Sequence, residues 1–327
     1  MRIPQLDGLR AISILLVLAG HLLPLGPKSW QLNATAAGMG MSLFFALSGF
    51  LITATLLHND SILDFAIKRV ARIVPLAYPY IAVVFLLFTF DPPALFYSAA
   101  FVVNYVHTYL NSYNSHLWSL CVEMHFYAAI AIVVAIFGIK NIWVVFPACL
   151  FVTALRIVDG AHYSILTHLR VDEILAGAGL AVLNHRRTFT VAPQGAVAVA
   201  AITWFLSASP LTGPIQFSRP YATVLFFACA MTQTRNVFGT VLTSIPMRYI
   251  ATISYALYMF HPITAHGWMN EGSVWIRYLF KRPVSLALTF TLAHLSTFYW
   301  ERPCLKAAKR LIASNALDRR TGYRANK

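Results

Sequence analysis

The chain has 327 residues, of which 58% are hydrophobic and only 11% are charged, and its formal net charge is +14. A mean hydropathy of +0.65 and repeated apolar stretches of membrane-spanning length exclude a water-soluble globular fold. The four cysteines form no C-x-x-C motif and no cluster with histidine, which argues against a disulfide framework or a structural zinc site. We therefore expect an all-α polytopic membrane protein without a metal.

Ten stretches are apolar and long enough to cross a bilayer. The first is expected to stay in the protein as a span, because the A-x-A-like site at 34–36 lies far beyond its apolar run. In chain order the predicted spans are 10–27, 37–57, 73–90, 117–138, 141–158, 169–184, 189–208, 219–234, 247–268 and 282–300.

An additional apolar stretch at 94–106 decides the orientation of everything after it. If it does not cross, 18 of the 25 lysines and arginines lie on the inner side, and if it crosses only 11 do. Cytoplasmic loops are enriched in lysine and arginine. We therefore predict about ten spans with both termini in the cytoplasm, and a short interfacial or re-entrant helix at 94–106.

The strongly basic C-terminal segment follows the last predicted span. We predict a membrane domain over 1–305 and a basic cytoplasmic tail over 306–327. Such a tail is simply explained as an anchor on the anionic lipid of the plasma (inner) membrane. It shows no recognisable nucleic-acid-binding fold, so membrane lipid is the expected partner and nucleic acid is not.

Ionisable residues inside spans are costly, so each one is a candidate for function. With the predicted topology they form two layers. At the inner boundary lie Arg10, Arg69 and Arg72, and towards the outer side lie His21, His116, Ser119, Glu123, Arg170, Asp172 and His261.

The first predicted span connects these two layers. Arg10 and His21 are eleven residues apart, so on a helix they share one face and lie roughly 16 Å apart along the axis. Arg69 and Arg72 are ordinary positive-inside residues on a simpler interpretation, and a histidine near a helix end is often a packing residue. Glu123 is harder to dismiss, because an acid within an apolar span must find a partner or stay protonated.

The chemistry of the two layers favours group transfer from a phosphate-bearing donor. Guanidinium groups pair with phosphate through charge-assisted, often bidentate hydrogen bonds. A buried imidazole beside a carboxylate is suited to removing the proton of a hydroxyl. A long donor that enters from the cytoplasm could reach both layers, and acyl-coenzyme A fits that description.

Seven motifs occur in one order along nearly the whole chain. They are LDGLRAISILLVLAGH, SLFFALSGFLIT, FAIKRVARIVPL, HLWSLCVEMHFY, LRVDEILAGAGLA, ISYALYMFHPIT and STFYWERP. With these motifs the chain resembles the acyltransferase 3 family of integral membrane acyltransferases, typified by enzymes that O-acetylate bacterial surface polysaccharides. The chain departs from the family at Met124 and His125, where members often have glutamate and then glutamine.

The resemblance implies a ten-helix fold, an acyl-coenzyme A donor and an acceptor hydroxyl on an extracytoplasmic molecule. It also implies that Arg10, His21, the arginines of the Arg69/Arg72 motif and Glu123 are needed for activity. The expected acyl group is acetyl, without a metal cofactor, and the expected acceptor is a saccharide, as in exopolysaccharide, or a lipid-linked saccharide.

The sequence leads to one mechanistic hypothesis. Arg10, Arg69 and Arg72 bind the phosphates of acetyl-coenzyme A, and His21 removes the proton of the acceptor hydroxyl. Glu123 either orients His21 or holds the acceptor. Ser119, Arg170, Asp172 and His261 are further candidates for the site.

Two alternatives stay open at this point. A covalent acyl-enzyme could form on His21, Ser48, Ser119 or Cys121, although apolar burial makes a thiol inert. A proton-coupled secondary transporter would also need membrane-embedded histidine, glutamate and arginine. We find no repeat that relates the two halves of the chain, which disfavours the transporter.

Overall fold

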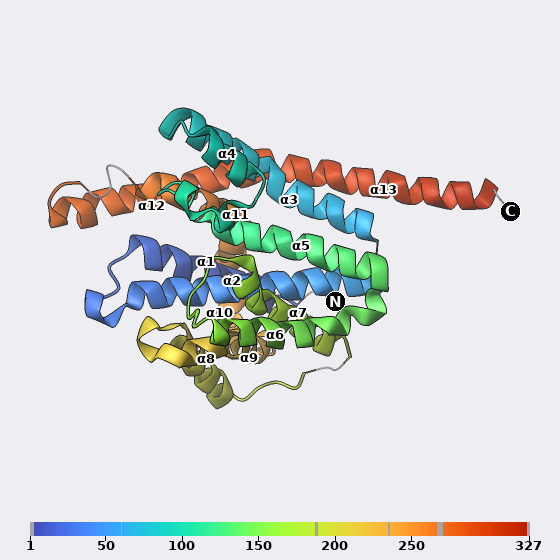
Figure 1. Cartoon of the computed structure of the whole chain (residues 1–327), viewed down its shortest axis with the longest axis horizontal. Coiled ribbons are helices and arrows are strands. Elements are labelled where there is room, and N and C mark those ends of the chain that lie inside the picture. The colour runs from blue at the N-terminus through green and yellow to red at the C-terminus, as the bar shows by residue number, and fades with distance from the viewer. Residues whose placement is uncertain (1–2, 60, 187–188, 235, 267–270, 326–327) are drawn as a thin grey trace.

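The computed structural model describes residues 3–59, 61–186, 189–234, 236–266 and 271–325 (Figure 1). Within these ranges all regular elements are helices, which confirms the predicted all-α class. The α-helices are α1 (Gln5–Leu22), α2 (Leu32–His58), α3 (Ile62–Val83), α4 (Pro92–Ala99), α5 (Leu117–Phe137), α6 (Val145–Val158), α7 (Asp172–Arg186), α8 (Gln194–Ala208), α9 (Arg219–Met231), α10 (Val237–Leu242), α11 (Ile245–Ala265), α12 (Arg282–Leu295) and α13 (Arg302–Ala325).

Five single helices are long and apolar enough to cross a membrane. They cover Gln5–Leu22, Lys28–His58, Ile62–Phe88, Leu117–Phe137 and Ile139–Val158. The pair Gln194–Ala208 and Pro210–Met231 passes the same test only together and is bent by 116°, as in a broken span or a re-entrant loop. The chain is therefore built as a membrane protein, and the count of ten spans stays a prediction.

Most predicted segments differ from the observed helices at their ends, and two of them show a local cause. The first span, predicted over 10–27, is a helix over Gln5–Leu22, because Leu23 adopts an extended conformation before Pro24. In the 94–106 stretch, α4 begins at the Asp91 N-cap, whose carboxylate accepts a hydrogen bond from Ala94 N. The eight residues of α4 rise only about 12 Å, against a hydrocarbon core of ~30 Å.

The predicted basic tail at 306–327 is helical as far as Ala325, where the described residues end. A π-helical turn, Ser296–Glu301, joins α12 to α13, so the chain stays helical from Arg282 to Ala325. Figure 1 shows α13 extending away from the other helices at the right.

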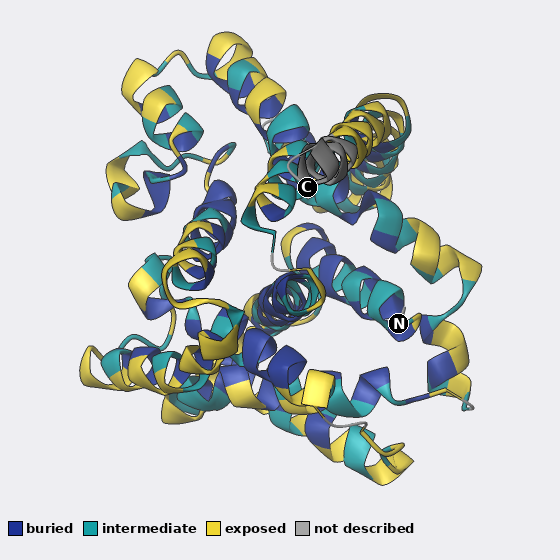
Figure 2. Ribbon diagram, turned by 90° about the vertical axis from the view of Figure 1, so that its right-hand side faces the viewer, coloured by how far each residue is buried: buried dark blue, intermediate teal, exposed yellow. Residues whose placement is uncertain are grey.

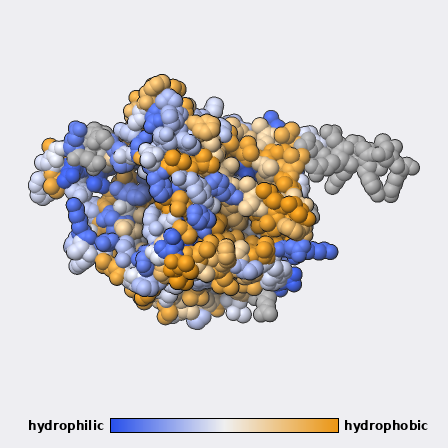
Figure 3. Space-filling view, viewed as in Figure 1, coloured by the Kyte–Doolittle hydropathy of each residue, from blue (hydrophilic) through white to orange (hydrophobic). Residues whose placement is uncertain are grey.

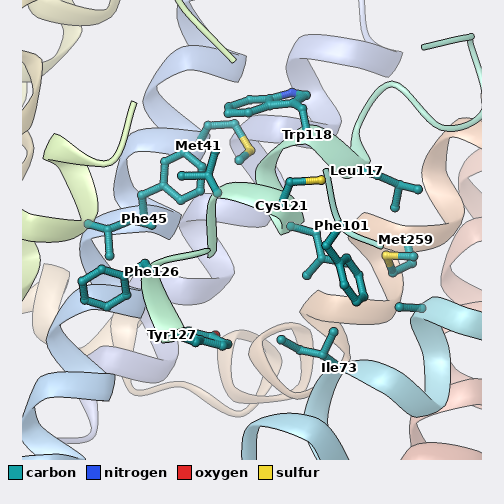
Figure 4. Close-up of a cluster of buried hydrophobic side chains, with 14 of the residues drawn as sticks. Met41, Phe45, Ile73, Phe101, Leu117, Trp118, Cys121, Phe126, Tyr127 and Met259 are labelled. Atoms are coloured by element: carbon teal, nitrogen blue, oxygen red, sulfur yellow. The ribbon is translucent and has the colours of Figure 1, made fainter. Parts of the chain in front are cut away.

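Apolar side chains cover both the interior and much of the surface. Figure 2 shows buried residues on the inner helices and exposed residues on the outer ones. In Figure 3 hydrophobic residues cover broad areas of the visible face, whereas hydrophilic residues gather towards the left end. Inside, α2, α5 and α11 meet in an apolar cluster that includes Phe45, Trp118, Cys121 and Met259 (Figure 4). This cluster holds three of the helices that carry the predicted site.

Glycines allow α2 and α7 to pack at backbone distance. A Cβ atom at Gly49 would lie 1.9 Å from Ile174 O, and one at Gly177 would lie 2.0 Å from Ala46 O. Small residues at helix interfaces favour such close approach in membranes. These glycines thus fix the position of α7, which begins with charged residues of the site.

We expect Gly49→Ala to destabilise the fold strongly. The added methyl group would meet a backbone carbonyl of α7, which cannot move aside as a side chain can. Overpacking of this kind costs about 1–3 kcal/mol, measurable as a lower unfolding temperature of the detergent-purified protein. Gly195→Ala is the matched control, because a Cβ atom at Gly195 has nothing within 4 Å. Equal stability of Gly49→Ala and Gly195→Ala would contradict the close helix approach.

Candidate functional site

Two cavities lie along the same four helices, α1, α2, α5 and α11. The larger has a volume of about 730 Å³, and we call it the histidine cavity because His21, His116, His261 and His266 line it. The smaller has a volume of about 60 Å³, and we call it the arginine cavity because its lining includes Arg10, Arg69 and Arg72. Helix α1 contributes His21 to the histidine cavity and Arg10 to the arginine cavity, whereas Glu123, which the sequence placed with the outer group, lines the arginine cavity.

The arginine cavity brings together the three arginines expected to bind phosphate. Arg69 and Arg72 lie one turn apart on α3, and Arg10 joins them from α1. The Arg69 guanidinium lies 5.5 Å from the ring centroid of Tyr127, and that of Arg72 lies 5.7 Å from the ring of Tyr255. Aromatic faces favour a nearby cation at such distances. The cluster thus has the charge and the donors for an anionic group.

Glu123 lies in the arginine cavity. Its carboxylate accepts a hydrogen bond from Ser48 Oγ at 2.6 Å and a short one from the Tyr127 hydroxyl. Its contacts in this structure are thus with Ser48 and Tyr127, and it lines a different cavity from His21. The reason is depth: Glu123 follows His116 by seven residues on α5, which places it about 10 Å further along the helix.

In the histidine cavity, the partner of His21 is His261. His21 Nδ1 lies 3.0 Å from His261 Nε2, and the two rings stack with a centroid distance of 5.1 Å. His261 Nδ1 lies 2.6 Å from the backbone carbonyl oxygen of Tyr258. The ring of His116 meets that of His261 edge-on at 5.6 Å. Although His261 was one of the sequence candidates, its pairing with His21 was not predicted.

These contacts determine which nitrogen of each histidine carries hydrogen. A carbonyl oxygen only accepts, so Nδ1 of His261 must donate to Tyr258 O. The other nitrogen of a neutral imidazole is an acceptor, so Nε2 of His261 accepts from Nδ1 of His21. Nε2 of His21 is then unprotonated. Because the His21 side chain is accessible within the cavity, its lone pair is available to a ligand.

Ser119 and Tyr258 connect the N-terminal end of α5 to α11. The two hydroxyl oxygens lie 2.6 Å apart, and the Tyr258 hydroxyl donates to the backbone oxygen of His116 at 2.7 Å. With the Tyr258 proton directed to His116 O, the Ser119 hydroxyl donates to the Tyr258 oxygen, and the Ser119 side chain is 1% exposed. Its hydroxyl therefore positions the backbone of this corner, and Cys121, which is fully buried in the apolar cluster, does not reach either cavity lining.

Arg170 and Asp172 belong to a buried ion-pair network at the start of α7. Arg156 Nη1 lies 2.5 Å from Asp172, Arg219 Nε lies 2.6 Å from Glu173, and Arg170 Nη2 lies 3.3 Å from Glu173. All five side chains are at most 1% exposed. Of the five, only Arg219 lines the histidine cavity.

The sequence alone missed several lining residues of the histidine cavity. Arg219 and Arg282 stand at the start of predicted spans, where a basic residue resembles a simple boundary charge. Tyr258 was within a recognised motif but had no role. Within the described ranges, no group of three or more histidine, cysteine or acidic side chains is arranged to hold a metal ion.

Comparison with known proteins identifies the family of this chain. A family model described as an acyltransferase domain matches residues 3–299. The peptidoglycan O-acetyltransferase OatA of Listeria monocytogenes is 27% identical over 93% of this chain and 56% of its own length. The putative peptidoglycan O-acetyltransferase YrhL of Bacillus subtilis is 28% identical over 79% of this chain and 48% of its own. The chain thus spans about half the length of these relatives, and no solved structure matches it.

Proposed function

Because the chain belongs to the acyltransferase family whose model covers residues 3–299, we propose that it is a membrane O-acyltransferase. It moves an acyl group, acetyl first of all, from cytoplasmic acyl-coenzyme A to a hydroxyl of a saccharide or lipid-linked saccharide on the other side of the membrane. One observation carries this proposal: His21 presents an unprotonated nitrogen in a large cavity, on the same helix that carries Arg10 to the arginine cavity.

The proposed topology has ten spans in the plasma (inner) membrane, with both termini in the cytoplasm. Residues 1–305 form the membrane domain and residues 306–327 a cytoplasmic tail. The excess of lysine and arginine on one side supports this orientation. It places the arginine cavity near the cytoplasm and the histidine cavity towards the outside.

Arg10, Arg69 and Arg72 bind the phosphates of the donor in this proposal. The roughly 16 Å rise between Arg10 and His21 is the distance that the pantetheine arm must cover. Phe44 lines the arginine cavity and Tyr258 the histidine cavity, and their rings stack at a centroid distance of 6.2 Å. We expect the donor arm to pass beside this pair.

His21 is the general base of the transfer. Its Nε2 takes the proton of the acceptor hydroxyl while the oxygen attacks the thioester carbonyl, and the coenzyme A thiolate leaves and is then protonated. The carbon–oxygen ester bond forms as the carbon–sulfur bond breaks. His261 keeps His21 in the required tautomer, as histidine partners commonly do. A trapped acyl group on the protein would instead support the covalent alternative.

We expect His261→Leu to lower kcat about 10- to 100-fold, by analogy with the partners that orient metal-binding histidines. The KM for the donor should stay unchanged, because His261 does not line the arginine cavity. His261→Gln should recover part of kcat, since its amide oxygen can again accept from His21 Nδ1. Steady-state kinetics of the three proteins is the measurement. A purely structural role would lower kcat equally in both variants.

Inverted membrane vesicles test the reaction itself. Coenzyme A with a labelled acetyl group is supplied to the cytoplasmic face of wild-type and His21→Ala protein, and glycans and lipids are then extracted. Peptidoglycan and its lipid-linked precursor are the first acceptors to include, because two relatives are named for peptidoglycan O-acetylation. Label in an extracted acceptor with wild type only supports the proposal. Uptake of a solute without thioester loss would favour the transporter instead.

A further inference from the structure

The histidine cavity is lined by cations without a lining carboxylate. Its lining includes the guanidinium groups of Arg219 and Arg282, together with four imidazoles, and none of the described lining residues is aspartate or glutamate. The arginine cavity, by contrast, contains Glu123. A cationic cavity without an acid of its own attracts an anionic ligand.

The Arg219 guanidinium has a nitrogen without a hydrogen-bond partner among the described residues. Its Nε donates to Glu173 Oε1 at 2.6 Å, but Nη2 has no hydrogen-bond partner in the part of the chain that the structure describes. The residue is 1% exposed. A buried donor without a partner is costly, and more so when it is charged.

The ion-pair network around Arg219 carries more positive than negative charge. It contains three arginines and two acids, and Glu173 is shared between Arg219 and Arg170. The Arg170 guanidinium lies 5.2 Å from the ring of Tyr163 and 5.5 Å from that of Trp118, and both rings line the histidine cavity. The network therefore presents an excess positive charge at the cavity wall.

The second cation comes from the opposite end of the chain. Arg282, at the start of α12, donates a short hydrogen bond to the backbone oxygen of Leu22, the residue after His21. Its Nε is also buried without a partner among the described residues. Arg282 thus brings a second positive charge to the cavity, on the side of His21.

From this arrangement we propose that the histidine cavity binds an acceptor with an oxyanion, a carboxylate or a phosphate, and that Arg219 is its main ligand. This inference rests on the proposed function and adds the chemical class of the acceptor. The anion holds the acceptor so that a hydroxyl of the same molecule reaches Nε2 of His21. Arg219 is in this sense a residue that determines specificity.

Matched acceptors test the proposal. Wild type is offered a uronic acid saccharide and its methyl ester, with labelled acetyl-coenzyme A as donor, and kcat/KM is measured for each. We expect the acid to be preferred about 10- to 100-fold, the usual worth of a hydrogen bond to a charged group. Arg219→Gln should bring the ratio close to one by slowing only the acid, and Arg219→Lys should keep part of it. Arg277→Gln is the control, because Arg277 does not line the cavity.

A second pair separates the two sources of the anion. A sugar phosphate and the same sugar without phosphate are compared in the same proteins. Preference for the uronic acid identifies a carboxylate of the saccharide, and preference for the sugar phosphate identifies a phosphate, as in a lipid-linked acceptor. An equal ratio in wild type and Arg219→Gln for both pairs would overturn the proposal.

A binding measurement that needs no acetyl transfer tests the anion site independently of the proposed reaction. The unfolding temperature of the detergent-purified protein is measured with each acid, ester, phosphate and neutral sugar. If an anion raises it in wild type but not in Arg219→Gln, the anion site stands even where no acetyl group is transferred. If transfer proceeds equally well to charged and neutral acceptors, the reaction stands and the anion site fails. Arg219→Lys checks that a lost response does not reflect a protein that fails to fold.

Discussion

Acyl transfer is expected to fall by about 10²- to 10⁴-fold in His21→Ala, the usual contribution of a positioned general base. The alanine variant loses the cavity-lining nitrogen that the contacts of His21 with His261 and of His261 with Tyr258 leave unprotonated. Donor affinity should stay close to that of wild type, because His21 does not line the arginine cavity. Label transfer and equilibrium binding of coenzyme A are measured on the same preparations.

His294→Ala serves as the matched control for this prediction. His294 lies on α12, where its Nδ1 is 3.1 Å from the Tyr249 hydroxyl oxygen, and it lines neither cavity. Its removal should leave the rate of transfer close to that of wild type. If His21→Ala retained transfer while its folding matched that of wild type, the general base would have to be another group.

The second large effect concerns the donor. In a variant with alanine at Arg10, Arg69 and Arg72, we expect coenzyme A to bind at least 10²-fold more weakly, because charge-assisted hydrogen bonds to phosphate contribute about 1.5–3 kcal/mol each. Pantetheine, which lacks these phosphates, should bind wild type and variant alike. The ratio of the two affinities isolates the phosphate contacts from any general loss of structure.

Arg248→Ala is the control for this variant. Arg248 is an exposed arginine near the start of α11, on the proposed cytoplasmic side, and it does not line the arginine cavity. Its loss should leave the ratio of affinities unchanged. Equal affinity of wild type and the triple variant for coenzyme A would show that the arginine cavity does not bind the donor.

Properties that depend on neighbours along the chain were predictable. Apolar length gave the helical membrane class, and every predicted span overlaps a helix in the described residues. The rise of 1.5 Å per residue separates Arg10 from His21 whatever surrounds the helix. The spacing of Arg69 and Arg72 likewise places both on one face, and the structure brings that face to Arg10.

Properties that depend on contacts between helices could not be predicted from the sequence. Glu123 and His116 share α5, but only the depth of α5 beside α1 decides which of them approaches His21. The pairing of Arg219 with Glu173 joins residues 46 positions apart, and no local pattern identifies such partners. The bend between α8 and α9 similarly arises in tertiary packing.

The sequence by itself thus determined the membrane class, the helices and the order of the acidic and basic side chains along each helix. These properties follow from composition and helix geometry. Only the tertiary structure decided that His21 faces His261, that Glu123 joins the arginines and that Arg219 reaches the histidine cavity. The rotation and depth of each helix are set by side-chain packing against its neighbours, such as Gly49 of α2 against Ile174 of α7, and that information is distributed over the whole chain.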